Sequence, residues 1–196
     1  MNKILLFTIA LSGAALGSYA QTKPLPQLSI GVEFGLPTSQ ASNAYIGQTS
    51  NVYGSAIGVS AKLELPVSAS PFSVVITTGL SYFLNRYYYS GPLRNGTFIT
   101  PIEAGGKYYF TKIGYFEGDF GVSADNYVLT LLDNGSPVRT KFENTAFIYS
   151  PIIGFTAPTS KHKATVDIGL RYEARVESGG TVSQVAIRIA YRFKLK

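Results

Sequence analysis

The sequence predicts an all-β protein, an eight-stranded antiparallel up-and-down transmembrane β-barrel with a filled lumen. Apolar and polar residues alternate with a period of two in eight segments, which is the pattern of strands with one apolar and one polar face. Only 14% of the 196 residues are charged, well below the ~25% that is usual in soluble domains. Aromatic residues make up 13% of the chain and glycine contributes 20 residues, a composition that favours strands and tight turns over helices.

The first twenty residues predict a secretory signal peptide. One cation, Lys3, precedes an apolar stretch at 4–11, and small residues follow up to Ala20. This order is typical of signal peptides, and the apolar stretch is shorter than the ~20 residues that span a membrane. We expect cleavage between Ala20 and Gln21 and a barrel domain at 21–196, whose formal net charge is +5 because Lys3 is lost from a chain of +6. The absence of cysteine excludes a lipoprotein anchor and a disulfide framework.

The first four predicted strands place apolar residues at alternate positions, opposite glycine, serine or charged residues. The apolar positions are Leu28, Ile30, Val32, Phe34 and Leu36 in the first, Tyr53, Ile57, Val59, Ala61, Leu63 and Leu65 in the second, Val74, Ile76, Leu80 and Tyr82 in the third, and Ile102, Ala104, Tyr108 and Phe110 in the fourth. These strands cover 28–36, 53–65, 72–84 and 102–110.

The last four strands follow the same rule, most strictly near the C-terminus. Their apolar positions are Phe116, Phe120, Val122 and Ala124 in the fifth, Phe147, Tyr149, Ile153 and Phe155 in the sixth, the even positions of 164–176 and the odd positions of 185–193. Pro151 interrupts the sixth strand, which we place at 147–155, after a fifth strand at 116–124. Several strands reach the ~9–11 residues that cross a bilayer at a tilt.

The connections alternate in length, as they do in outer-membrane barrels with short periplasmic turns and long external loops. Long polar connections are predicted at 38–52, 85–96 and 125–143, and the last contains the turn signal Asp133-Asn134-Gly135. Short connections are predicted at 66–71, 111–112 and 158–163. The final link, 177–181, is also short, although a long one is expected there. This arrangement predicts both termini on the periplasmic side.

The distribution of charge decides which face points outward. A soluble lipocalin-like barrel turns its apolar face inward, whereas a membrane barrel turns that face to lipid. The polar strand faces hold eight acidic and seven basic residues, and the apolar faces hold no charge. Because an eight-stranded lumen is just wide enough for side chains, such a set predicts paired charges without an open pore. The predicted lumen network consists of Glu33, Lys62, Glu64, Glu103, Lys107, Glu117, Asp119, Asp167, Arg171, Glu173, Arg175, Arg188 and Arg192.

Aromatic residues near strand ends support the membrane interpretation, because amphipathic rings settle at membrane interfaces. These residues are Tyr82, Tyr108, Phe110, Tyr172, Tyr191 and Phe193. The opposite interpretation, in which the charges simply face water on a soluble barrel or sandwich, remains the alternative.

Two segments resemble a known family. The run Pro-Ile-Glu-Ala-Gly-Gly-Lys-Tyr-Tyr-Phe at 101–110 and the aromatic-ended strand at 185–193 are similar to the outer-membrane β-barrel family common in Bacteroidota, a porin-like group akin to the small OmpA/OmpX-type barrels. The resemblance implies that Tyr191 and Phe193 form the signal read by the barrel-assembly machinery. Here Lys194-Leu195-Lys196 follow Phe193, so the aromatic residue is not terminal as it usually is in the family.

The sequence contains few candidate catalytic residues. His162 lies in a predicted short turn between Lys161 and Lys163, without a positioned partner for general-base work. Glu117 and Asp119 share one face as an acid/base pair would, but salt-bridged filling of the lumen is the favoured interpretation. Clusters with metal-ligand spacing and phosphate-binding glycine loops are absent from the sequence. We expect no cofactor and no metal, and the positive charge is too thinly spread for nucleic-acid binding.

These observations predict a non-enzymatic, monomeric outer-membrane protein that resides in the lipid bilayer and has a structural, surface-binding or adhesion role through its external loops. Lipopolysaccharide phosphate is a candidate ligand of Arg86, Arg94, Arg139 and Lys141 by charge complementarity. Three alternatives remain open: a soluble periplasmic or secreted lipocalin-like barrel that binds an apolar ligand, a narrow channel, and a lipid-modifying enzyme that uses carboxylates and hydroxyls.

Overall fold

Eight strands and no other regular element make up the part of the chain that the computed structural model describes, namely residues 25–39, 53–68, 70–85, 93–133, 136–158, 164–177 and 180–195. The strands are β1 (Gln27–Ser39), β2 (Tyr53–Pro66), β3 (Phe72–Asn85), β4 (Leu93–Tyr109), β5 (Gly114–Asp133), β6 (Ser136–Pro158), β7 (Ala164–Glu177) and β8 (Gly180–Lys194). Within these ranges there is no helix long and apolar enough to cross a membrane.

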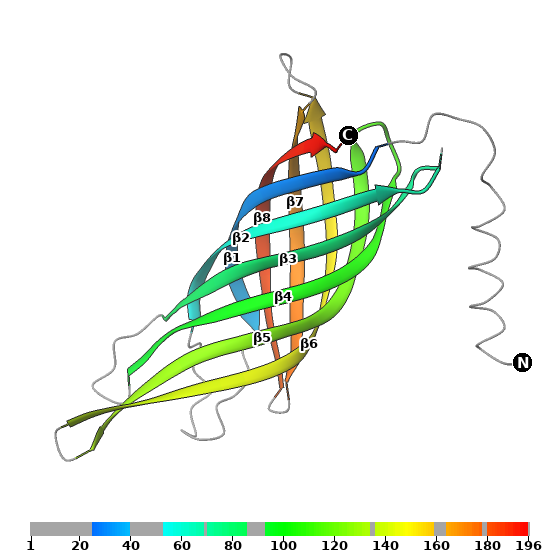
Figure 1. Ribbon diagram of the computed structural model, residues 1–196. Coiled ribbons are helices and arrows are strands. Elements are labelled where there is room, and N and C mark those ends of the chain that lie inside the picture. The colour runs from blue at the N-terminus through cyan, green and yellow to red at the C-terminus, as the bar shows by residue number, and fades with distance from the viewer. Residues whose placement is uncertain are drawn as a thin grey trace, which may run out of the picture.

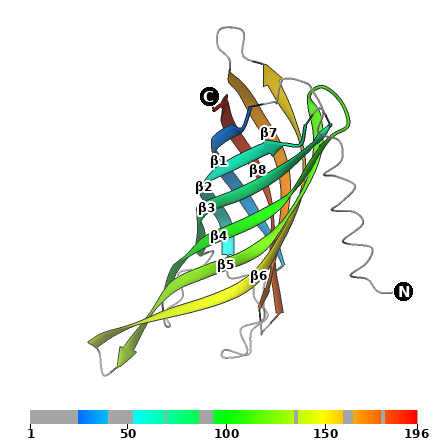
Figure 2. The same ribbon diagram turned by 45° about the vertical axis from the view of Figure 1, so that its right-hand side comes forward.

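The strands form one closed barrel in which each strand pairs antiparallel with its neighbours in the chain. Closure is made by β1 and β8, whose register runs from Gln27 opposite Lys194 to Ser39 opposite Ser183. The strands are strongly tilted, and the C-terminus and the start of β1 lie at the same end (Figures 1 and 2). The predicted all-β, eight-stranded antiparallel barrel is therefore confirmed. We call the end that holds the C-terminus the termini end and the opposite end the loop end.

Strand parity separates the two faces of the barrel wall. In β8, buried and exposed positions alternate without exception from Ala186 to Arg192. In β1, Glu33 is buried whereas its neighbours Val32 and Phe34 are 43% and 54% exposed. Because neighbouring side chains in a strand point to opposite faces, one register places the charged residues inside, together with some apolar ones such as Phe83, and turns apolar residues outward around the barrel.

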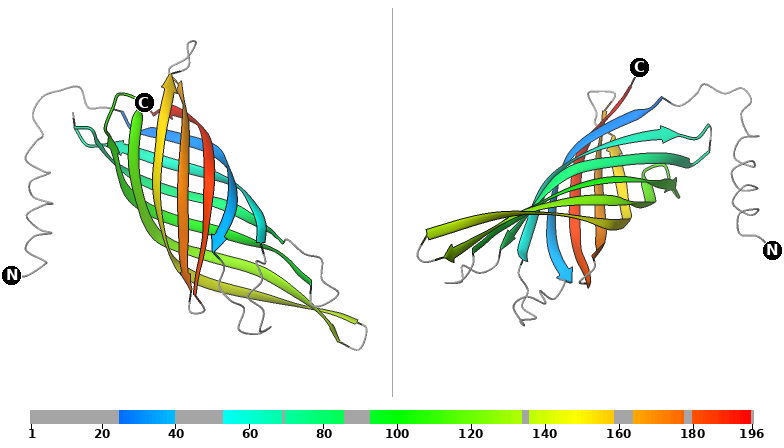
Figure 3. Two further views of the ribbon diagram at one scale, coloured as in Figure 1. Left: turned by 180° about the vertical axis from the view of Figure 1, so that it is seen from behind. Right: turned by 60° about the horizontal axis from the view of Figure 1, so that its bottom comes forward.

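The prediction of a long loop at 125–143 is wrong. Residues 125–133 and 136–143 continue β5 and β6 as a paired hairpin, in register from Asp125 opposite Asn144 to Asp133 opposite Ser136. The hairpin projects obliquely beyond the rest of the loop end (Figures 1 and 3). The last pair of the hairpin, Asp133 opposite Ser136, adjoins the turn signal that the sequence shows at 133–135. Likewise, residues 93–96, expected in a loop, belong to β4.

Pro151 does not end a strand. It lies within β6 and pairs with Gly118 of β5, whereas the ladder between β6 and β7 stops at Tyr149 and resumes at Ile152. Because proline has no N–H group to donate, the gap appears in one ladder only. The interruption predicted at Pro151 is thus local.

Several predicted features lie outside the described residues. They are the signal peptide with its cleavage site between Ala20 and Gln21, the connection at 40–52, His162, and Arg86. The strands that contain Arg94, Arg139 and Lys141 are described, but the side chains of these three residues are not.

Candidate functional site

The barrel interior contains the largest concentration of ionisable side chains. All thirteen residues of the predicted lumen network lie inside the barrel, and none is more than 7% exposed. They come from six strands, β1, β2, β4, β5, β7 and β8, and the other two strands, β3 and β6, contribute hydroxyls that bond to them. Charges so removed from water are stable only when paired and hydrogen-bonded, so the contacts between them define the site.

A first cluster lies toward the termini end and consists of Lys62, Glu64, Lys107, Glu117, Asp167 and Arg192. Lys107 is at its centre, with its Nζ 3.1 Å from Asp167 Oδ2 and 3.2 Å from Glu64 Oε2. Lys62 forms an ion pair with Glu117, and the guanidinium of Arg192 lies 3.0 Å from Glu64. This termini-side cluster contains three cations and three carboxylates, so its charges balance.

Two tyrosines complete the termini-side cluster. The Tyr115 hydroxyl donates to Asp167 Oδ1 at 2.7 Å, and the Tyr109 hydroxyl donates to Glu64 Oε1 at 3.0 Å. The ammonium of Lys107 also lies 3.6 Å from the centre of the Tyr115 ring, close enough for a cation–π contact. Tyr115 is 1% exposed, so its ring fills interior space as well as donating a hydrogen bond.

A second cluster lies at mid-barrel and consists of Glu33, Glu103, Arg171, Glu173 and Arg188. The guanidinium of Arg171 lies 3.0 Å from Glu173 and 3.3 Å from Glu33, and it forms an ion pair with Glu103. Arg188 lies 3.5 Å from Glu33 and 3.6 Å from Asp167, so it links this central cluster to the termini-side cluster. The two clusters form one network along the barrel axis.

The loop end of the interior is less polar. Arg175 pairs with Asp125 at 2.9 Å, and its guanidinium carbon lies 5.7 Å from the centre of the Phe83 ring. Phe83 packs with Ala56 and Ile99 as a small apolar cluster. Sequence periodicity did not identify these inward apolar residues, because an apolar residue on a polar face merely weakens the alternation.

The count of buried charges matches the prediction for acidic residues and differs for basic ones. Eight acidic residues are buried, Asp125 among them, but six basic residues in place of seven, because Lys194 lies exposed at the rim. The hydroxyls of Ser73, Thr77 and Ser150 donate to Glu64, Asp119 and Glu103 respectively. These small polar residues carry no sequence signal of their own, because serine and threonine are equally common in turns and at exposed positions.

The Glu117 and Asp119 pair does not form a catalytic arrangement. Glu117 is engaged by Lys62, and Asp119 Oδ2 accepts a hydrogen bond from Thr77 at 3.2 Å. Both carboxylates are less than 5% exposed, which leaves them without access to a substrate in solution. Among the described residues there is also no group of three His, Cys, Asp or Glu side chains arranged to hold a metal ion.

The outer surface has the opposite character. Thirty large hydrophobic side chains in the described strands and turns are exposed, among them Ile102 and Phe120 at 61% each. Aromatic pairs lie toward both ends of this apolar belt. At the termini end they are Phe72–Tyr108, Phe110–Phe116 and Tyr191–Phe193, and toward the loop end they are Tyr82–Phe98 and Phe147–Tyr149. The predicted assembly-signal residues thus lie in the belt, and Tyr191 is 48% exposed.

The fold is that of known small barrels. Two crystal structures of Ail, the attachment invasion locus protein of Yersinia pestis, match with a TM-score of 0.58 and 14% sequence identity over 88% of this chain and 100% of Ail. One of them contains the heparin analogue sucrose octasulfate. Neisserial surface protein A matches with a TM-score of 0.49 and 14% identity over 87% of this chain and 97% of that protein. No protein-family model and no curated sequence matches the chain.

Proposed function

We propose that the chain is a non-enzymatic, integral outer-membrane β-barrel protein. The observation that supports this most directly is its reversed polarity, with buried ion pairs inside and a continuous belt of apolar side chains outside. In water this belt would form an exposed apolar surface far larger than the few hundred Å² tolerated by soluble monomers. In a bilayer the same surface contacts lipid, and its aromatic pairs lie where the interfaces are expected. Ail, an outer membrane protein, has the same fold.

Membrane residence is tested by fractionation and gel mobility. We expect the full chain, produced in a bacterium with an outer membrane, to remain in the membrane pellet after carbonate extraction. Unheated samples are expected to migrate differently from boiled ones, as folded barrels do in detergent. Release by carbonate without a mobility shift would favour the soluble barrel that binds an apolar ligand.

We further propose that the lumen is filled and does not conduct ions. Eight strands leave room for little more than side chains, and buried ion pairs occur from Glu64 near the termini end to the Arg175–Asp125 pair near the loop end. Planar-bilayer recordings of the wild-type protein are therefore expected to show background conductance only. The double variant Glu103→Ala and Arg171→Ala, which removes side chains from mid-barrel, serves as the control and is expected to conduct. Steady wild-type conductance would favour the channel alternative.

The proposal excludes a lipid-modifying enzyme because the interior carboxylates are used in ion pairs and are inaccessible. Overproduction of the chain is expected to leave the lipid A profile of the host unchanged in mass spectra. A new acylated or deacylated species that disappears in a Glu117→Gln variant would support the enzyme instead.

We propose a surface-binding or adhesion role for the loop end. The β5–β6 hairpin extends β-structure beyond the barrel wall, and the name of Ail connects a barrel of the same fold with attachment. Bacteria that display the full chain are expected to adhere to cultured cells more strongly than bacteria that display a variant shortened within the hairpin, at 129–140. Equal adhesion at equal, heat-modifiable surface levels would exclude the hairpin from this role.

Two partner proposals follow from the sequence. Arg94, Arg139 and Lys141 belong to the loop-end parts of β4 and β6, and Arg86 follows β3 in the sequence, so lipopolysaccharide phosphate is proposed as their ligand by charge complementarity. Tyr191 and Phe193 are proposed as the contact for the barrel-assembly machinery during insertion, after removal of residues 1–20.

The protein is proposed to act as a monomer, because β1 and β8 close the barrel without a second chain.

A further inference from the structure

A pocket of about 300 Å³ opens at the termini end of the barrel. It lies between the last residues of β4, β6 and β8 and the first residues of β1 and β7, with Lys112 of the β4–β5 turn at its edge. Its lining residues are Gln27, Tyr109, Lys112, Thr156, Thr165, Arg192 and Lys194. None of these described lining residues is acidic, and three are cationic.

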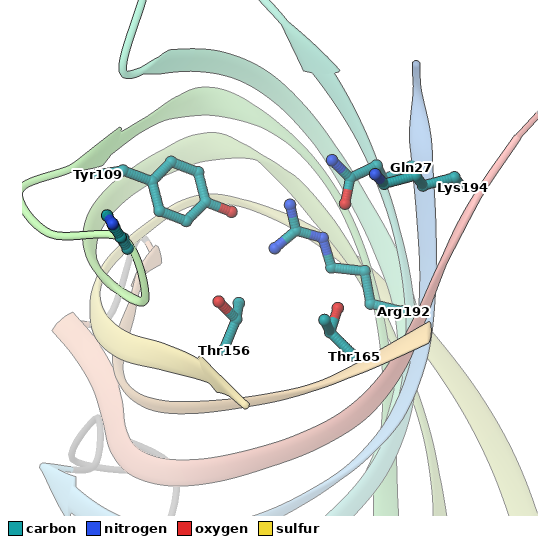
Figure 4. A pocket seen from close by; sticks show the side chains of 7 residues that line it. Gln27, Tyr109, Thr156, Thr165, Arg192 and Lys194 are labelled. Atoms are coloured by element: carbon teal, nitrogen blue, oxygen red, sulfur yellow. The ribbon is translucent and has the colours of Figure 1, made fainter. Parts of the chain in front are cut away.

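Arg192 is the central group of the pocket. Figure 4 shows its guanidinium projecting into the space between Tyr109 and Gln27, with the hydroxyls of Thr156 and Thr165 on the opposite side. The residue is only 7% exposed, and one of its terminal nitrogens donates to Glu64 at 3.0 Å. Its Nε is buried and has no hydrogen-bond partner in the part of the chain that the structure describes. A buried, unpaired donor on a charged group is costly unless a ligand or water accepts from it.

The charge balance of the pocket is positive even though Glu64 lies beneath it. Glu64 is shared, because it also contacts Lys107 at 3.2 Å and accepts from Tyr109. Lys112 and Lys194 lie exposed at the rim. Arg192 is balanced within the termini-side cluster, so the net positive charge of the pocket comes from the two rim lysines, which an anion from outside could neutralise.

We propose that this pocket binds a phosphate group. A tetrahedral oxyanion presents several acceptor oxygens, which match the guanidinium, ammonium, amide and hydroxyl donors that line the pocket. The volume is at the lower limit for small-ligand sites, so it fits a phosphate with a small substituent. The aromatic pairs at the termini end place the pocket at headgroup depth if the barrel spans a bilayer. The phosphate is therefore supplied either by a lipid headgroup or by a soluble phosphate compound.

The test is titration of the full-length barrel, folded in the phosphate-free detergent lauryldimethylamine oxide, with inorganic phosphate, followed by calorimetry and ³¹P NMR. We expect saturable binding to the wild-type protein. The rim double variant Lys112→Gln and Lys194→Gln is expected to bind at least about fivefold more weakly, as two exposed charges would give. The Arg192→Gln variant is expected to lose binding.

The matched control is the double variant Asn126→Asp and Asn144→Asp in the loop-end parts of β5 and β6, which lowers the net charge by the same two units far from the pocket and is expected to bind like the wild type. The rim variant changes only exposed side chains, so it tests the proposal even if Arg192→Gln fails to fold. Absence of saturable binding to the wild type, or equal weakening by the control, would overturn the proposal.

A second arm identifies the source of the phosphate. Inorganic phosphate is titrated into the same barrel in nanodiscs of phosphatidylglycerol and, separately, in detergent. If phosphate binds the wild type more weakly in the nanodiscs than in detergent, and this difference between the media disappears in the rim variant, a lipid headgroup competes for the pocket. Equal binding in both media assigns the pocket to soluble phosphate compounds. Either result supports the phosphate site, and the titration does not depend on whether the proposed surface role is correct.

Discussion

Replacement of Arg171 by methionine is the sharpest test of the buried network. Its guanidinium contacts Glu33, Glu103 and Glu173, and it also donates to Ser150 at 3.0 Å. Methionine is close in length but carries no charge and no donor. The variant therefore leaves three buried carboxylates facing one another without this cation, while the space inside the barrel stays largely occupied.

The expected cost follows from these contacts. Hydrogen bonds to charged groups contribute about 1.5–3 kcal/mol each, but they are not additive within one network. Removal of one partner of a buried ion pair costs about 3–5 kcal/mol, because the remaining charge stays buried and unpaired. We expect the free energy of unfolding to fall by this amount. With a urea dependence of about 2 kcal/mol/M, the midpoint shifts by roughly 2 M.

The assay is reversible urea unfolding in lipid vesicles, followed by circular dichroism and by the mobility shift of the folded barrel. Fluorescence would have to rely on tyrosine, since the chain has no tryptophan. As a control, Glu103→Gln in the Arg171→Met background removes surplus negative charge and is expected to restore part of the lost stability. A change below about 1 kcal/mol for Arg171→Met would refute a dry, paired interior and would indicate that water screens these charges.

Three further tests use substitutions in other parts of the barrel. Ile189→Arg places a charge on the outer belt and is expected to lower stability in vesicles by about 2–4 kcal/mol, whereas a face in contact with water would change by less than about 0.5 kcal/mol. Gly121→Ala is expected to reduce the yield of heat-modifiable barrel, because a Cβ there collides with the backbone of β4, while Gly118→Ala folds normally because its Cβ meets open space. Replacement of Tyr191 and Phe193 by alanine is expected to slow insertion by reconstituted assembly machinery but not refolding in detergent; equal insertion rates would exclude the proposed signal.

Strand faces could be predicted from the sequence because the period of two is a local property. In a segment such as 185–193, each residue's face depends only on its parity, and inward Arg188 and outward Ile189 follow directly. Once the faces are assigned, eight such strands leave few arrangements, since a closed barrel satisfies every backbone group at its edges. The same reasoning placed the charged residues of the network inside.

The hairpin at 125–143 could not be predicted in this way. In the sequence, residues 125–143 show no strict alternation of apolar and polar residues, although the backbone continues the β5–β6 ladder, with Thr130 opposite Arg139 and Leu129 opposite Thr140. Partner choice within the lumen was equally inaccessible, because the link from Arg188 to Asp167 depends on barrel tilt and shear, which sequence parity does not encode.

The buried charges also help to specify how the barrel closes. Glu33 and Arg188 lie directly opposite each other in the β1–β8 register, and Glu173 lies opposite Gln184 in the β7–β8 register. A slip of β8 by one residue would turn Arg188 and Arg192 to the lipid face, at a cost of up to about 2–4 kcal/mol each. A slip by two residues keeps the faces but moves Arg188 away from Glu33. An apolar lumen would oppose the second error far less, because aliphatic side chains pack similarly in either register. The ion pairs therefore discriminate against misregistered closure, even though a buried salt bridge is weak evidence for stability by itself.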